Sequence, residues 1–322
     1  MTLSVNPLGC SPRVVKMLKQ LDTKDVSTYP DINRILVAGS KRFSLPTSCI
    51  LAGNGSEQLI KLIAQTLLKP GDTAIVQSGS FSLFKKECMI AGATVTLCEI
   101  SSLINQPIQP KILFLCNPNN PTGELIPKKT LRQIIAAFPK TFIVIDEANA
   151  EFTDQTYIQE ATNKPNVLIL RTCSKAFGLA GLRVGFCIGN PILMKTLQAV
   201  QQPFPISSLS IKLATTALLD TPFLARTIKM ISKERVKMMN VLRERGFTVS
   251  NSVTNTIFVS MPRAEQIIAQ LNNIGVSVIP NEFFPGLTTL GFRIALRDKK
   301  TNQLFLQKLD TAIEQIGINL IR

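Results

Sequence analysis

The chain has 322 residues, 45% of them hydrophobic, with 17 Gly, 19 Pro and no low-complexity tract, which is typical of a folded globular protein with one large or two modest domains. It contains no histidine, so His-based catalytic triads and His-ligated metal sites are excluded. The net charge of +15 is spread along the chain, and only 2 Tyr and no Trp are present to stack on bases; we therefore favour solvated faces and a site for small anions over nucleic-acid binding.

The sequence also bears on location. The N-terminal residues MTLSVNPLGC lack a basic start followed by an apolar run, and no apolar stretch approaches the ~20 residues that span a bilayer. The 7 cysteines are odd in number and show no CxxC spacing, which favours reduced, mostly buried thiols. We expect a cytoplasmic protein without a membrane partner.

The first two thirds of the chain alternate between strand-like and helix-like segments. A helix is expected from Gly55, with Ser56 as the N-cap candidate and apolar residues at helical spacing. Helix-like segments are also expected at 81–91 and 127–138. Short apolar runs predict buried strands at 74–77, 93–98, 111–116, 141–146, 166–170 and 184–189. This alternation predicts an α/β fold with a mostly parallel central sheet flanked by helices.

The last third has a different pattern. A long helix is expected over Pro222–Arg245, where Gly246 suits the C-terminal stop. Strand-like segments follow at 247–250, 255–261 and 276–280, and helices are expected at 262–273 and 300–316. The pattern predicts a smaller α+β C-terminal domain. The expected division is an N-terminal arm (1–28), a large cofactor-binding domain (29–240) and a small domain (241–322).

Polar residues follow several of the predicted strands. NPNNPTG (117–123) comes directly after one strand, Asp146 ends the next, and Ser174 and Lys175 follow a third. In an open parallel sheet, ligands bind beyond the carboxyl ends of the strands, so these residues are expected to share one site. AGNGSEQ (52–58) adds a glycine-rich turn at a helix N-terminus, which is an anion-binding arrangement.

This combination fits the requirements of pyridoxal 5′-phosphate. The cofactor's aldehyde needs a lysine, its pyridine nitrogen needs a carboxylate, and its phosphate needs a helix N-terminus with hydroxyl and arginine donors. The chain offers Lys175, Asp146, the turn formed by Gly55, Ser56 and Glu57, and the pair Ser174 and Arg183.

An ordered set of motifs also carries a family resemblance over nearly the whole chain. The motifs are NPLG, YPD, AGNGSEQ, CNPNNPTG, DEA, SKAFGLAGLRVG and FRIALR. The chain resembles the fold-type I pyridoxal-phosphate enzymes of the class I/II aminotransferase family. It is most similar to histidinol-phosphate aminotransferases and threonine-phosphate decarboxylases.

The resemblance implies a role for each matching position around the cofactor. Lys175 would carry the Schiff base and Asp146 would pair with the pyridinium nitrogen. Asn120 would hydrogen-bond the ring 3′-oxygen, and Phe81 would stack on the ring. The phosphate would be held by backbone groups of Ser56 and Glu57 together with the side chains of Ser174 and Arg183.

Two further matches concern the substrate and the assembly. Arg293 matches the arginine that binds the substrate α-carboxylate, where a planar two-pronged donor suits a planar acceptor. Tyr29 matches a tyrosine that reaches the phosphate of the partner subunit, which implies a homodimer with shared active sites. Structural alternatives stay open: core packing for Phe81, a turn tyrosine for Tyr29 and a surface ion pair for Arg293.

The chain departs from the family pattern at several positions. Asn149 stands where the aminotransferases usually have a tyrosine that bonds the 3′-oxygen. The His-Gly-Gly start of the decarboxylases is missing, yet the NPLG start and the tail resemble that group. Arg297 stands where the aminotransferases usually have glycine, and it is a candidate for a second anionic group or an exposed arginine.

These observations favour a pyridoxal-phosphate-dependent aminotransferase acting on an anionic amino acid or amine, with a phosphorylated substrate included. A decarboxylase of a phosphorylated amino acid is the alternative, because both reactions begin with the same residues and differ in substrate orientation. A pyridoxal-phosphate-binding protein without turnover is a further alternative. No metal is expected.

Overall fold

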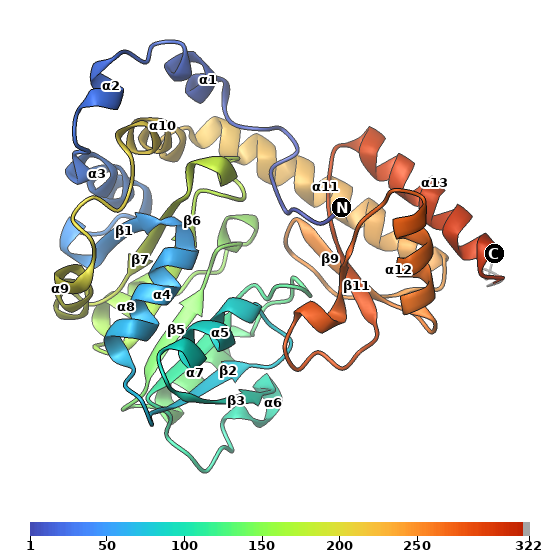
Figure 1. The fold of residues 1–322 in the computed structure, drawn as a ribbon, viewed down its shortest axis with the longest axis horizontal. Coiled ribbons are helices and arrows are strands. Elements are labelled where there is room, and N and C mark those ends of the chain that lie inside the picture. The colour runs from blue at the N-terminus through green and yellow to red at the C-terminus, as the bar shows by residue number, and fades with distance from the viewer. Residues whose placement is uncertain (318–322) are drawn as a thin grey trace.

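A seven-stranded sheet forms the larger part of the molecule, and a four-stranded sheet forms a second part (Figure 1). The computed structural model describes residues 1–317. The strands of the first sheet are β1 (Ile50–Asn54), β2 (Thr73–Gln77), β3 (Thr94–Cys98), β4 (Ile112–Cys116), β5 (Phe142–Asp146), β6 (Val167–Thr172) and β7 (Val184–Ile188). Their order is β1-β7-β6-β5-β4-β2-β3. Strands β2 to β6 pair in parallel and β7 is antiparallel to both of its neighbours, so the predicted mostly parallel α/β sheet is confirmed.

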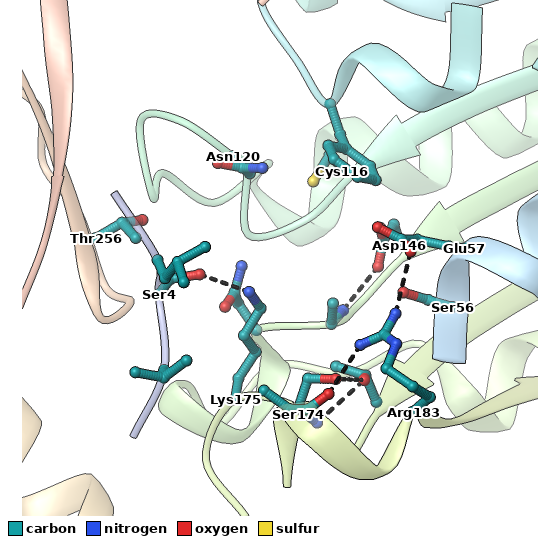
Figure 2. Close-up of a pocket in the computed structure, with 17 residues that line it drawn as sticks. Ser4, Ser56, Glu57, Cys116, Asn120, Asp146, Ser174, Lys175, Arg183 and Thr256 are labelled. Atoms are coloured by element: carbon teal, nitrogen blue, oxygen red, sulfur yellow. Dashed lines mark hydrogen bonds and ion pairs between the residues drawn. The ribbon is translucent and has the colours of Figure 1, made fainter. Parts of the chain in front are cut away.

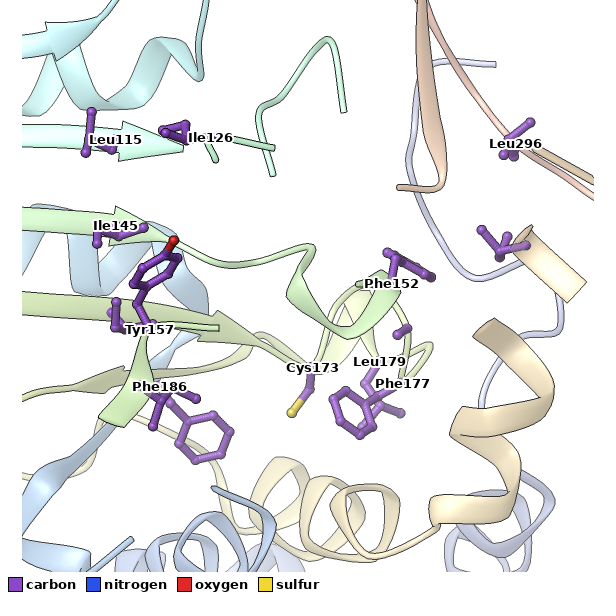
Figure 3. Close-up of a cluster of buried hydrophobic side chains, with 14 of the residues drawn as sticks. Leu115, Ile126, Ile145, Phe152, Tyr157, Cys173, Phe177, Leu179, Phe186 and Leu296 are labelled. Atoms are coloured by element: carbon purple, nitrogen blue, oxygen red, sulfur yellow. The ribbon is translucent and has the colours of Figure 1, made fainter. Parts of the chain in front are cut away.

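Helices cover both faces of this sheet, because its central strands are apolar on both sides. Strands β4, β6 and β7 are buried along their whole length, and alternate residues point to opposite faces. One face packs against α4 (Gly55–Leu67), α5 (Ser82–Ile90) and α9 (Pro191–Val200). The other face packs against α3 (Ile32–Phe43), α7 (Lys128–Ala137), α8 (Ile158–Asn163) and α10 (Ser208–Leu218). Figure 3 shows part of this second core, where Leu115 and Ile145 from the strands lie near Tyr157.

The smaller sheet is antiparallel throughout, in the order β10-β11-β9-β8. Its strands are β8 (Thr248–Val249), β9 (Thr256–Ser260), β10 (Ile279–Pro280) and β11 (Gly291–Ala295), and its helices are α12 (Ala264–Asn273) and α13 (Lys299–Gln315). Helix α11 (Thr221–Glu244) precedes this sheet, and the Asp220 side chain caps it by accepting a hydrogen bond from Phe223 N. The short helices are α1 (Pro12–Leu18), α2 (Lys24–Ser27) and α6 (Ile100–Leu103). The division at residue 240 stays a prediction, and α11 runs through that position.

Most of the predicted elements are confirmed to within a few residues, and one detail is wrong. Ser56 is not the N-cap of α4: the helix begins at Gly55 with Asn54 as the cap, because the positive φ of Gly55 (75°) turns the chain into the helix directly after β1. Strands β1 and β11 and helices α3, α9 and α10 were not predicted. The two strands are short and mix glycine with other residues, whereas α3 has an amphipathic helical period that the sequence analysis missed.

The cysteines and the helices agree with the expectations from composition. All 7 cysteines carry free thiols, and every one except Cys10 is buried. Within residues 1–317, no helix is both long and apolar enough to cross a bilayer.

Candidate active site

A cavity of about 290 Å³ lies at the carboxyl edge of the seven-stranded sheet (Figure 2). The last residues of β4, β5 and β6 line it: Cys116, Asp146 and Thr172. The antiparallel β7 begins at the same edge, which brings Arg183 to the cavity as well. The remaining lining comes from the loops after β4, β5 and β6, the N-termini of α4 and α5, residues 3–5 and β9. The cavity therefore lies where parallel-sheet topology places a ligand site.

Lys175 and Asp146 both face this cavity, and burial moves the pKa of each toward neutrality. The Lys175 Nζ donates a hydrogen bond to Ser4 Oγ at 2.5 Å. Burial, together with the nearby charge of Arg293, lowers the pKa of Lys175 to about 8. Asp146 is buried, and its Oδ1 accepts a hydrogen bond from Ala148 N at 2.9 Å. Burial raises the pKa of Asp146 to about 6. A fraction of the amine is thus neutral, and hence nucleophilic, near pH 7.

The N-terminus of α4 forms one corner of the cavity. The first N–H groups of the helix have no partner within it. Strand β7 passes so close that a Cβ on Gly185 would lie 2.7 Å from Ser56 N. Arg183 reaches the same corner, where its Nη2 donates to a carboxylate oxygen of Glu57 at 3.1 Å. The Ser174 hydroxyl accepts a hydrogen bond from Thr172 Oγ1 at 2.9 Å.

Gly55 contributes to this corner through its backbone. Its positive φ of 75° is a conformation that favours glycine, and a Cβ there would lie 2.8 Å from Nη2 of Arg183. Any larger residue would push the guanidinium away from the helix N-terminus. The predicted group Gly55, Ser56, Glu57, Ser174 and Arg183 is therefore together in space.

Arg293 joins the two sheets at this site. It lies on β11, and its Nη1 donates to Asn120 Oδ1 at 2.8 Å, while its Nη2 donates to the carbonyl oxygen of Thr2. Burial lowers the pKa of Arg293 to about 10, still well above neutrality. Because the Asn120 oxygen accepts from Arg293, the Asn120 amide nitrogen remains available as a donor toward the cavity.

The two aromatic candidates are placed differently. Phe81 lines the cavity from the start of α5 and makes an edge contact with Phe84, at 5.6 Å between ring centroids. Tyr29 lies outside the cavity of its own subunit, is 82% exposed, and stacks on Phe204 at 4.6 Å. A role for Tyr29 at a cofactor requires a second subunit and stays a prediction.

Asn149 and Arg297, the two departures from the family pattern, also differ in position. Asn149 lines the cavity, and its Oδ1 is buried with no hydrogen-bond partner among residues 1–317. Arg297 follows β11 and is not part of the cavity lining; its backbone N–H donates to Asn302 Oδ1. The Asn149 side chain is thus available to hydrogen-bond a ligand in the cavity, whereas Arg297 lies outside the cavity lining.

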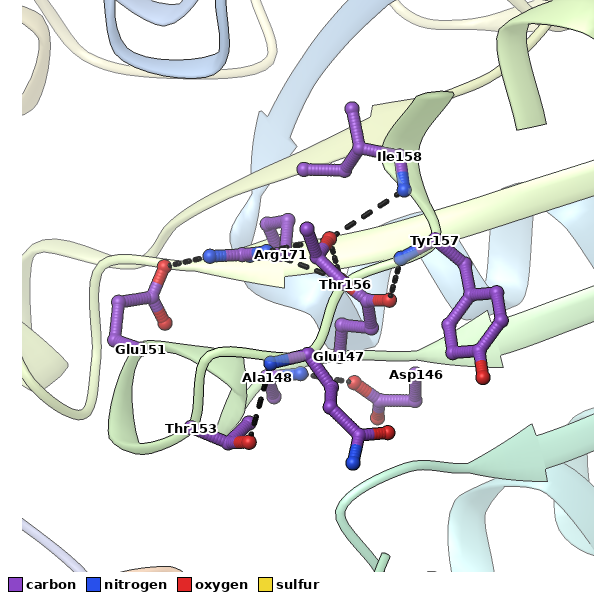
Figure 4. Close-up of polar contacts among 10 residues, drawn as sticks. Asp146, Glu147, Ala148, Glu151, Thr153, Thr156, Tyr157, Ile158 and Arg171 are labelled. Carbon is purple, nitrogen blue, oxygen red and sulfur yellow. Dashed lines mark hydrogen bonds and ion pairs between the residues drawn. The ribbon is translucent and has the colours of Figure 1, made fainter. Parts of the chain in front are cut away.

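A buried ion network fixes the loop that carries Asn149 (Figure 4). Arg171 on β6 pairs with Glu147 at 3.0 Å and also with Glu151. Glu147 further accepts hydrogen bonds from Tyr157 N at 2.7 Å and Thr156 Oγ1 at 2.6 Å. Both carboxylate oxygens of Glu147 are therefore hydrogen-bonded, and these bonds anchor the chain directly after β5.

Several cavity residues were not among the predicted site residues. They are Leu3, Ser4, Val5, Cys116, Ala148, Thr172, Ala180 and Thr256. Cys116 and Thr172 could have been found, because Cys116 ends the strand predicted at 111–116 and Thr172 lies between the strand predicted at 166–170 and the predicted site residue Ser174. Ser4 and Thr256 carry no local signal, since they come from the N-terminal segment and from the other sheet.

Comparisons with known proteins place the whole chain in one family. The model for aminotransferase class I and II matches residues 1–309. A histidinol-phosphate aminotransferase of Ruminiclostridium cellulolyticum is 32% identical over 321 residues, covering 94% of this chain and 89% of the relative. A histidinol-phosphate aminotransferase 2 of Bacillus cereus is also 32% identical, covering 96% of this chain and 86% of the relative.

Solved structures agree with this at the level of the fold. A histidinol-phosphate aminotransferase of Sinorhizobium meliloti in complex with pyridoxal-5′-phosphate superposes with a TM-score of 0.90 at 22% identity, covering 98% of this chain and 91% of that one. An L-threonine-O-3-phosphate decarboxylase of Porphyromonas gingivalis superposes with a TM-score of 0.86 at 24% identity, covering 97% of this chain and 98% of that one. The chain belongs to the class I and II aminotransferase family and is a fold-type I enzyme that depends on pyridoxal 5′-phosphate.

Proposed function

We propose that this enzyme transfers the amino group of an anionic amino acid or amine, and that a phosphorylated substrate such as histidinol phosphate is among those it accepts. The observation that carries the proposal is the convergence of the Lys175 amine, the Asp146 carboxylate and the Asn120 amide on one cavity, with Arg293 hydrogen-bonded to Asn120. The names of the relatives at 32% identity support the choice of substrate class.

The groups around the cavity fit the cofactor. The α4 N-terminus with Ser174 and Arg183 offers the donors that a phosphate requires, and Asp146 offers a buried carboxylate for the ring nitrogen. The Asn149 Oδ1 is buried and has no hydrogen-bond partner among residues 1–317, and buried polar atoms normally have one. A bound ligand with a polar group would provide this partner. Bound pyridoxal phosphate supplies an aldehyde that bonds to a lysine amine and a ring that accepts the electron pair released at the substrate Cα.

We assign the protein's own part of the chemistry to four residues. Lys175 provides the amine for the covalent link and, once released, a base for the proton on the substrate Cα. Asp146 holds a proton at the ring nitrogen through its negative charge. Asn120 donates its amide hydrogen to the ring oxygen, and Arg293 orients the substrate by its carboxylate.

The products distinguish this function from the decarboxylase alternative. Purified enzyme would be supplied with histidinol phosphate or threonine phosphate and a keto-acid acceptor, and both CO₂ and the transferred amino group would be measured. We expect amino transfer without CO₂. Stoichiometric CO₂ without amino transfer would contradict the proposal and support decarboxylation. CO₂ is measured because a threonine-phosphate decarboxylase has a similar fold.

Glu57 is expected to compete with the cofactor phosphate for Arg183. The two side chains pair at 3.1 Å beside the helix N-terminus, and the pair is partly exposed. Replacing Glu57 by Gln removes a negative charge next to the phosphate position, so the Kd for pyridoxal phosphate should fall by about threefold to fivefold, the scale of an exposed ion pair. Equilibrium dialysis of the cofactor-free protein would measure this.

Inorganic phosphate offers a second measurement for the same change. It should raise the melting temperature of Glu57→Gln more than that of the parent protein, because binding stabilises the folded state. Glu99→Gln, on the segment after β3, serves as the control. A weaker affinity of Glu57→Gln for both ligands would show that the carboxylate assists binding instead.

Arg293→Lys is expected to raise KM for every amino-acid substrate. Lysine keeps the charge but loses the two-pronged contact. The loss of charge-assisted hydrogen bonds costs about 2–3 kcal/mol, which corresponds to a rise in KM of about 30- to 150-fold. Arg297→Ala should leave KM for substrates with a single anionic group unchanged. Within residues 1–317, the Arg297 side chain makes no hydrogen bond to a residue that lines the cavity, whereas Arg293 donates to Asn120. Initial-rate kinetics with a series of amino donors would test both. An unaltered KM in Arg293→Lys would remove Arg293 from substrate binding.

We also propose that the enzyme is a cytoplasmic homodimer. Three valines are exposed in the segments around the stacked pair of Tyr29 and Phe204. Val26 and Val200 lie three and four residues before the two rings in the chain, and Val37 lines a surface pocket together with Pro203. A subunit contact would explain this exposure. The 7 free thiols support a reducing compartment. Sedimentation equilibrium would test the assembly, and a monomeric active enzyme would contradict it.

A further inference from the structure

The first six residues form a strap between the two sheets, which we call the N-terminal strap (Met1–Asn6). At one end, the Met1 carbonyl accepts a hydrogen bond from Ala295 N at 2.8 Å, beside the contact between the Thr2 carbonyl and Arg293. At the other end, the Asn6 amide donates to the carbonyl of Ala176 at 2.9 Å and to Thr227 Oγ1 at 3.1 Å. Figure 1 shows the N-terminal segment reaching β9 and β11 from α1. The strap is therefore anchored on both sides of the cavity.

Ser4 lies between these anchors and faces Lys175 (Figure 2). It is 8% exposed, it lines the cavity, and its hydroxyl oxygen lies 2.5 Å from Nζ of Lys175. The strap cannot slide relative to the lysine, because Asn6 is bonded to the carbonyl of Ala176, the next residue after Lys175. Two independent contacts thus fix Ser4 opposite the lysine amine.

We propose that Ser4 is a positioning residue for Lys175: its hydroxyl oxygen accepts a hydrogen bond from the amine and holds it on the substrate side of the cavity, ready to take the proton from the substrate Cα. This inference rests on the proposed function of Lys175 and adds a residue to it. In the proton transfer the amine lone pair takes the Cα proton, and the resulting ammonium donates to Ser4 Oγ.

The physical need for such a partner follows from the lysine side chain. It has a flexible four-carbon stem and a compact head with three donors, so a fixed acceptor selects one orientation of the amine. Within residues 1–317, the Lys175 Nζ makes one hydrogen bond, and its partner is Ser4 Oγ. The other charged or titratable groups around the amine act at longer range: Arg293, Asp146, Arg183, Glu57 and Cys116. None of these supplies the local acceptor that a directed proton transfer requires.

The hydroxyl also affects the charge of the amine. A hydrogen bond to the ammonium form favours that form. Removing the hydroxyl is therefore expected to lower the pKa of Lys175 further below its ordinary value, by about one unit. A residue that only packs the strap in place would leave this titration unchanged, which gives a readout specific to positioning.

The experiment compares Ser4→Ala with Ser4→Thr, which keeps the hydroxyl, and with Lys16→Ala, an exposed position on α1, as the control. In Ser4→Ala we expect kcat to fall about tenfold with little change in KM, and the primary isotope effect with Cα-deuterated substrate to increase. The acid limb of the kcat profile should move to lower pH. Ser4→Thr should retain most of the rate, and Lys16→Ala should match the parent enzyme.

A second measurement needs no turnover. In the cofactor-free proteins, the pH dependence of reductive methylation at Lys175, followed by mass spectrometry, reports the titration of the amine directly. A downward shift in Ser4→Ala, restored in Ser4→Thr, supports the proposal. Identical titration curves in all variants would overturn it, even with a lower kcat, since the strap would then act by packing alone. If the parent enzyme itself formed no covalent link at Lys175, the proposed function would fail instead.

Discussion

Lys175→Ala is expected to reduce turnover at least about a thousandfold and to abolish the covalent capture of pyridoxal phosphate. The change removes both the amine that bonds to the aldehyde and the base next to the substrate Cα. No nearby group can replace it, because the other cations close to the amine, Arg183 and Arg293, are guanidinium groups, which neither bond to the aldehyde nor accept the proton. Single-turnover kinetics and mass spectrometry after borohydride reduction would measure the two effects.

The controls for this prediction separate charge from nucleophilicity. Lys175→Arg keeps a cation at the position but cannot bond to an aldehyde, so it should be as inactive as the alanine variant. Lys229→Ala, on the exposed side of α11, should behave like the parent enzyme. Capture of a full equivalent of cofactor as a borohydride-stable adduct in Lys175→Arg would refute the assignment.

Asp146→Asn is expected to have opposite effects on activity and on stability. The neutral amide cannot hold the ring nitrogen protonated, and the loss of one positioned charge in a buried site typically costs a factor of about 10² to 10³ in kcat. The amide has nearly the same shape as the carboxylate and keeps an oxygen for the hydrogen bond from Ala148 N. The fold should therefore be preserved while the electrostatics change.

The stability effect depends on pH, because burial raises the pKa of Asp146 from 3.8 to about 6 in the folded protein. A raised carboxyl pKa means that folding favours the protonated form. This contribution to stability is fully present below pH 3.8 and is lost as the pH rises through about 6. Above pH 6, the ionised carboxylate lowers the free energy of unfolding of the cofactor-free protein by on the order of 3 kcal/mol. The uncharged amide of Asp146→Asn has no such effect.

Thermal unfolding of the cofactor-free proteins between pH 5 and pH 8 would check this. The melting temperature of Asp146→Asn should exceed that of the parent at pH 8 by several degrees, and the difference should shrink toward pH 5. Asp154→Asn, an exposed carboxylate in the following loop, is the control and should show no such trend. If the parent protein were as stable as Asp146→Asn at pH 8, burial would not destabilise the ionised carboxylate, and the raised pKa of Asp146 would be contradicted.

The sequence alone identified the elements and the chemistry that are encoded locally. The segments 112–116 and 142–145 are apolar throughout, which indicates strands buried on both faces, and they form β4 and most of β5. Asp146, Ser174 and Lys175 could be assigned to one edge because parallel strands end on the same side of a sheet. The corner at Gly55 was visible as a glycine-rich turn before a helical period.

Only the tertiary structure decided what depends on partners far along the chain. An apolar run shows that a strand is buried but not which strand it pairs with, so the antiparallel direction of β7 between β1 and β6 was not predictable. The bond between Arg293 and Asn120 spans 173 positions, and that between Lys175 and Ser4 spans 171. Such contacts are fixed by packing and not by local preference. The sequence therefore predicted the roles of Lys175 and Asp146, while only the fold showed that the Ser4 hydroxyl lies beside the Lys175 amine.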